Sequence, residues 1–145
     1  MSCWDTSALL KLYLQEADSA TFRQLAADTE RITISAIARF ETEAVFRRKE
    51  VDGAIPRNEA DAFQRQFDTD TQSGAINSIP LGPAVEILYS DVLRNCLART
   101  PPVFVRASDA LHITTALAEG ETQFVTADAR QRAAAILMGL QVSPT

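Results

Sequence analysis

Short apolar runs alternate with amphipathic helical segments along the whole chain, and this alternation limits the folds open to it. Strand patterns lie at residues 2–4, in ERITIS, in AINSIPL, in QFVTAD and in the late run LQV. Helical patterns begin at Ser7, Asp18, Ser35, Asn58, Pro83, Ser108 and Ala129. Because strands separated by helices pair in parallel, we predict an α/β fold, a mostly parallel central sheet flanked by helices on both faces.

The chain leaves little room for a second domain. It has 145 residues, and neither an internal repeat nor a flexible linker interrupts it. An apolar content of 46% is sufficient for one hydrophobic core. We therefore expect residues 1–145 to form a single domain, with Cys3 and Cys96 as buried thiols rather than as a disulfide.

The composition limits where in the cell the protein is expected to reside and how it can bind its ligands. No apolar run approaches the roughly 20 residues that span a bilayer, and the start lacks a secretory signal, so we expect a cytoplasmic protein. The net charge of -5 argues against nucleic-acid binding by a broadly basic surface. The basic clusters Arg47-Arg48-Lys49 and Arg130 with Arg132 are each typical of a solvated helix face. A metal ion held by acids is another way to bind a phosphate.

Three aspartates fall at one edge of the predicted sheet. Asp5 ends the first strand, Asp128 ends the fourth, and Asp109 lies in the first turn of the helix that leads to the fourth. Carboxyl ends of parallel strands and the N-termini of their helices share an edge, so these carboxylates should meet. Helix capping is the better explanation for any one of these aspartates when it is taken alone. Ser7 and Ser108 are better placed as caps, which weakens that explanation.

Glu41 lies on a helix face that we expect to be buried. The apolar stripe of the helix after Ser35 consists of Ile37, Phe40, Ala44 and Val45. Glu41 falls inside this stripe, about 40° around the helix from its first member, whereas Phe46 points to the opposite face, where it is available to a protein partner. A carboxylate buried alone is costly, so Glu41 requires either a cation in the crevice or an ion pair with Arg39 or Arg48.

Four acids in one crevice indicate a metal site. Asp5, Glu41, Asp109 and Asp128 would repel one another strongly unless a divalent cation neutralised them. Mg²⁺ or Mn²⁺ suits a site built only of oxygen ligands, and either ion retains water molecules that can act as nucleophiles.

Four motifs, taken in order, resemble those of PIN-domain ribonucleases, and most closely the VapC toxins of prokaryotic toxin–antitoxin pairs. These motifs are WDTSALLKLY, SAIARFETE, SDALHITTAL and FVTADARQRAAAILMGLQV, and they extend from Asp5 to Val142. The resemblance implies a catalytic set of Asp5, Glu41, Asp109 and Asp128, in which the three aspartates bind Mg²⁺ or Mn²⁺. It also implies that Thr6, Ser7 and Thr126 orient these carboxylates.

The same resemblance implies a reaction and partners. A metal-activated water would cleave RNA, and Glu41 would orient or deprotonate that water. Proteins of this kind are typically homodimers that a cognate antitoxin blocks near the acids. His112 is better explained by packing or by bonding within its own helix than as a general base.

Other functions fit these residues less well. A phosphoacceptor receiver domain would carry a second acid beside Asp5 and a lysine after a late strand. A haloacid dehalogenase-like phosphatase would carry an aspartate two positions after Asp5, where this chain has Ser7. The remaining alternative is a catalytically inactive PIN-like module that binds RNA or protein, and the complete acidic set argues against it.

Overall fold

All of the predicted strands and helices form in the computed structural model, which describes residues 1–145. The strands are β1 (Ser2–Trp4), β2 (Ile32–Ser35), β3 (Ile76–Ile79), β4 (Gln123–Val125) and β5 (Gln141–Ser143). The helices are α1 (Thr6–Tyr13), α2 (Ser19–Ala27), α3 (Ala36–Val51), α4 (Glu59–Gln72), α5 (Pro83–Leu97), α6 (Ala107–Ala118) and α7 (Ala129–Leu137). None of the helices combines the length and the apolar character needed to cross a membrane.

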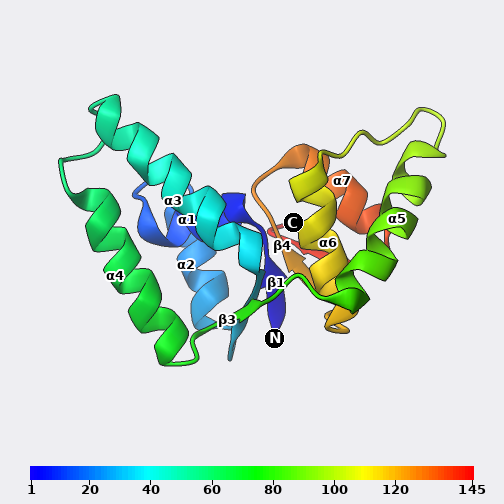
Figure 1. Cartoon of the computed structure of the whole chain (residues 1–145), viewed down its shortest axis with the longest axis horizontal. Coiled ribbons are helices and arrows are strands. Elements are labelled where there is room, and N and C mark those ends of the chain that lie inside the picture. Colours follow the sequence, from blue (N-terminus) through cyan, green and yellow to red (C-terminus); the bar gives the residue numbers. More distant parts are fainter.

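The five strands form one parallel sheet in the order β3-β2-β1-β4-β5, which confirms the predicted fold class. β1 is central, because Trp4 pairs with Ile34 of β2 on one side and with Val125 of β4 on the other. In Figure 1, α1 to α4 lie on one side of β1 and α5 to α7 on the other. This order brings the carboxyl ends of β1, β2 and β4 side by side at one edge of the sheet.

The central strand divides the core in two, because successive side chains of a strand point to opposite faces. Trp4 lies in a cluster with Leu9 and Phe22, while Cys3 lies in a second cluster with Phe124. Both cysteines are free and buried, as predicted. The residue that follows this doubly packed strand, Asp5, is therefore fixed in position by the core itself.

The buried face of α3 differs from the predicted one. Its buried residues are Ala38, Thr42 and Phe46, spaced by four, whereas Phe40 is 62% exposed. Both the predicted stripe and the predicted exposure of Phe46 are therefore wrong. The reason lies in α4, because the ring of Phe46 stacks on Phe63 with centroids 4.4 Å apart and planes 9° from parallel.

This packing makes Phe46 and Phe40 a matched pair for a stability test. Phe46→Ala should lower the free energy of unfolding by about 3–5 kcal/mol, because it leaves a cavity against α4. Phe40→Ala should change it by less than about 1 kcal/mol, because that ring is mostly in water. Urea unfolding followed by circular dichroism measures both values, and equal losses would contradict the assignment of the buried face.

Candidate active site

All four predicted acids line a single cavity of about 170 Å³. Its lining comes from the carboxyl end of β1, the start of α1, α3, and the N-terminal ends of α6 and α7. The lining residues are Asp5, Thr6, Ser7, Leu10, Glu41, Arg106, Asp109, His112 and Asp128. Thr126, the last of the predicted supporting residues, directly follows β4 and donates a hydrogen bond to Asp5. Residues separated by more than a hundred positions are thus brought together by the strand order.

Asp5 is buried and caps α1. Its Oδ1 accepts hydrogen bonds from the Ala8 backbone N–H at 2.9 Å and from the Ser7 hydroxyl at 2.7 Å, and its Oδ2 accepts one from Thr126. The prediction that Ser7 caps this helix is therefore wrong, because the Ser7 hydroxyl donates to the true cap. Burial raises the pKa of Asp5, and the nearby His112 together with these donors opposes that rise.

Asp128 caps α7 in the same way. Its Oδ1 accepts from the backbone N–H groups of Arg130 at 2.8 Å and Gln131 at 3.1 Å. Its own backbone N–H donates to the Thr126 hydroxyl at 3.0 Å. Thr126 therefore joins Asp128 to Asp5 through its hydroxyl.

Asp109 lies at the start of α6, which begins at Ala107. The Arg106 backbone N–H donates to its Oδ2 at 3.1 Å, so Asp109 and not Ser108 closes this helix end, contrary to the prediction. The buried amide of Gln131 donates to the Asp109 backbone carbonyl at 3.0 Å. Because Gln131 also binds Asp128 through its backbone, it fixes the start of α6 against the start of α7.

Glu41 is held by a buried histidine that the sequence did not connect with it. The Nε2 of His112 donates to Glu41 Oε1 at 2.8 Å, and the Thr6 hydroxyl donates to the same oxygen at 2.8 Å. Although half-burial opposes ionisation, the hydrogen bonds from His112 and Thr6 outweigh it and lower the pKa of Glu41. Neither proposed arginine pairs with Glu41; Arg39 pairs with Glu43 instead.

The comparison with protein families agrees with the fold and with these motifs. The family model of the PIN domain matches residues 3–137. The chain belongs to the PIN-domain family. No curated protein matches it.

Solved structures share the fold of this PIN domain at low sequence identity. VapC20 of Mycobacterium tuberculosis, a toxin that cleaves the sarcin–ricin loop, is 18% identical with a TM-score of 0.70, over 92% of this chain and 95% of that one. A VapBC2 complex from Rickettsia felis, bound to promoter DNA, is 17% identical with a TM-score of 0.65, over 99% and 98%. FitAcB from Neisseria gonorrhoeae is 16% identical with a TM-score of 0.67, over 98% and 96%.

The oxygen ligands in the cavity of this PIN domain suit Mg²⁺ or Mn²⁺ by their chemistry. Asp128 accepts its two hydrogen bonds from the protein on Oδ1, which leaves Oδ2 free. Asp109, in contrast, faces the guanidinium of Arg106 with both of its oxygens. No group of three His, Cys, Asp or Glu side chains is arranged to hold a metal ion in this conformation.

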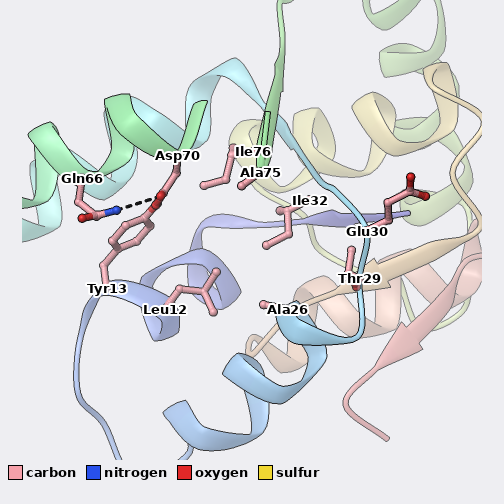
Figure 2. A pocket seen from close by; sticks show the side chains of 10 residues that line it. All are labelled: Leu12, Tyr13, Ala26, Thr29, Glu30, Ile32, Gln66, Asp70, Ala75 and Ile76. Carbon is pink, nitrogen blue, oxygen red and sulfur yellow. Dashed lines mark hydrogen bonds between the residues drawn. The ribbon is translucent and has the colours of Figure 1, made fainter. Parts of the chain in front are cut away.

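A second, larger cavity lies at the opposite, amino-terminal edge of the sheet (Figure 2). It measures about 410 Å³ and is lined mainly by apolar side chains of α1, α2, β2 and β3. Its acid Asp70 accepts hydrogen bonds from Tyr13 at 2.6 Å and from Gln66 at 2.9 Å. None of the four predicted acids lines it, so the candidate active site is the smaller cavity.

The burial of Asp5 predicts how two substitutions there differ in stability. A carboxyl group whose pKa is raised on folding costs stability when it is ionised, and this cost disappears as the pH falls toward the unfolded value near 3.8. Asp5→Asn keeps the cap and removes the charge, so at pH 7 without divalent ions it should be at least as stable as the wild type. Asp5→Ala should lose about 1 kcal/mol, the usual loss for a missing helix cap.

Urea unfolding in EDTA compares the three proteins at pH 7 and again at pH 5. The advantage of Asp5→Asn should shrink at the lower pH. An Asp5→Asn protein that is as unstable as Asp5→Ala would contradict the role of burial.

Proposed function

We propose that this PIN domain is a Mg²⁺- or Mn²⁺-dependent endoribonuclease and the toxin of a VapBC-type toxin–antitoxin pair. The main support for the proposal is that four acids converge on one small cavity, namely Asp5, Glu41, Asp109 and Asp128. Its donors are all oxygen atoms, and the family to which the chain belongs contains nucleases of this type. The fold of VapC20, which cleaves an RNA loop, is a further support.

Each acid has its own part in the proposed reaction. Asp5, Asp109 and Asp128 hold the divalent ion, with Thr6, Ser7 and Thr126 orienting the carboxylates. A bound ion supplies Lewis acidity at a phosphoryl oxygen and lowers the pKa of a coordinated water. Glu41 accepts a hydrogen bond from the attacking water and turns it toward the phosphorus atom. His112 keeps the Glu41 carboxylate directed into the cavity through their 2.8 Å hydrogen bond.

The proposed substrate is RNA in the cytoplasm. The protein is acidic, with a net charge of -5, so general attraction to phosphates is weak. In the cluster at residues 47–49, Arg47 is already paired with Asp61 at 2.9 Å and with Glu43 at 3.3 Å. Recognition therefore depends on contacts close to the cavity and on the shape of an exposed RNA loop or single strand.

The reaction is tested with purified protein and a pool of cellular RNA. Mg²⁺ or Mn²⁺ should support cleavage, and EDTA should abolish it. Asp5→Asn and Asp109→Asn should each lower the rate by more than about 100-fold, because even residues that only support metal ligands are worth about 10–100-fold. Circular dichroism should show that both variants remain folded.

A catalytically inactive PIN-like module is the second candidate, and the absence of three acids arranged around one point favours it. The cleavage experiment separates the two candidates. Protein that cuts no RNA with either ion, and binds Mn²⁺ no better than Asp109→Asn, would be such a module and not a nuclease.

We further propose that the toxin forms a homodimer and is blocked by a cognate antitoxin. Large apolar side chains are exposed on α5 and just before α6, namely Ile87 (71%), Leu97 (48%) and Phe104 (70%), and they would suit a subunit interface. Phe40 is exposed beside Glu41 and would contact an antitoxin segment that covers the acids. The complexes of Rickettsia felis and Neisseria gonorrhoeae support this partner by analogy of fold. A short neighbouring reading frame that encodes a DNA-binding protein would identify the antitoxin.

A further inference from the structure

Arg106 is the only arginine or lysine that lines the acidic cavity. Its Nε lies 3.2 Å from Asp109 Oδ2, and its Nη2 lies 3.4 Å from Asp109 Oδ1. The guanidinium thus covers both oxygens of one proposed metal ligand. The hydrogen bond and charge of Asp109, followed by the charges of Asp128 and Glu41, raise the pKa of Arg106. The arginine therefore neutralises part of the acidic cavity.

The pairing of Arg106 with Asp109 is weak by the usual measures. Both guanidinium contacts are longer than the 2.7–2.9 Å that is typical of charge-assisted hydrogen bonds. The Arg106 side chain is 64% exposed, and exposed ion pairs contribute little to stability. The other donors to the acids are helix N–H groups, largely buried hydroxyls and the buried imidazole of His112, which cannot leave without local unfolding. Arg106 is the donor that can move.

A divalent ion and the guanidinium compete for the same oxygens. The two oxygens that Asp109 would offer to an ion are the ones that Arg106 now contacts, and two cations cannot share this carboxylate at close range without repulsion. Once displaced, the guanidinium remains at the rim of the cavity, because the carbonyl of Arg106 is bonded within α6 to the N–H of Ala110 at 3.1 Å. A planar guanidinium is well suited to a phosphate group, which it can bind with two parallel hydrogen bonds.

We infer that Arg106 exchanges partners at this site, holding Asp109 in the metal-free protein and a backbone phosphate of the nucleic acid once a divalent ion has bound. The inference rests on the proposed metal-dependent ribonuclease activity and adds a residue to it. It predicts that the side chain of Arg106 weakens the binding of the metal ion and strengthens the binding of the substrate. A purely structural role for Arg106 would not separate these effects.

The test uses Arg106→Ala, Arg106→Lys and a matched control, Arg94→Ala. Arg94 also forms an exposed ion pair with an acid three residues away, Asp91, at 2.9 Å, but it lies outside the cavity. Calorimetric titration measures Mn²⁺ binding without RNA. Fluorescence anisotropy with Mn²⁺ measures binding of a labelled, mixed-sequence 2′-O-methyl RNA oligonucleotide, which a gel then verifies to be intact.

Arg106→Ala should bind Mn²⁺ about two- to fivefold more tightly than the wild type, the range that a lost exposed ion pair allows. It should bind the oligonucleotide about threefold or more weakly, because one charge-assisted contact is lost. Arg106→Lys should lie between the two proteins, since it keeps the charge without the paired donors. Arg94→Ala should match the wild type in both measurements.

Unchanged or weaker Mn²⁺ binding by Arg106→Ala would overturn the exchange, even if binding of the oligonucleotide also fell. An Arg106→Ala protein that binds the oligonucleotide as well as the wild type would overturn it as well. If the wild type itself binds Mn²⁺ no better than Asp109→Asn, the proposed metal-dependent activity fails first, and the inference fails with it.

Discussion

The repulsion among four carboxylates in one small cavity is the constraint that the surrounding structure must satisfy. Hydrogen-bond donors close to each acid in the fold offset this repulsion. Asp5 accepts from Ala8, Ser7 and Thr126, Asp128 from Arg130 and Gln131, Asp109 from Arg106, and Glu41 from Thr6 and His112. Most of these donors are hydroxyls or N–H groups at helix starts, where the helix dipole also favours negative charge. The acids are therefore tolerated before any metal ion binds.

Helix capping by these aspartates is compatible with the metal binding that we propose for them. Asp128 caps α7 through Oδ1 alone, and its Oδ2 accepts no hydrogen bond from the chain. Asp5 divides its bonds similarly, with the cap on Oδ1 and only the Thr126 hydroxyl on Oδ2. The capping bond fixes the direction of each carboxylate, so the second oxygen is presented to the cavity. In this arrangement a capping aspartate is a better ligand than an unrestrained one.

The fold and the meeting of the acids could be predicted because they depend on strand order and on the shared edge of a parallel sheet. The residues that cap the starts of the helices were harder to predict. Ser7 and Ser108 look like caps locally, yet Asp5 and Asp109 take that position. The face of α3 could not be read from its own sequence, because the stacking of Phe46 on Phe63 is decided by a different helix.

Several hydrogen-bond partners of the acids could not be assigned from the sequence either. His112 lies one turn after Asp109, so its place near the cavity was predictable, but its bond to Glu41 requires knowledge of how α3 and α6 pack. Arg106 directly precedes α6, and Gln131 lies in the first turn of α7. A search for polar residues within three positions of each predicted ligand would have found all three. No local pattern distinguishes them from ordinary helix residues.

If this acidic protein acts on RNA as proposed, it must restrict its affinity for phosphate to one place. With a net charge of -5, the surface as a whole repels a polyanion, and a metal-free cavity of four carboxylates repels it further. A bound divalent ion would neutralise much of the negative charge of the cavity and release Arg106 at the same time, so both cations would become available to the substrate together. Binding of RNA would then depend on the ion more steeply than neutralisation of the acids alone would require. On the proposed function, the acidic surface would favour substrates that present a single exposed phosphate segment to the cavity over long, regular helices.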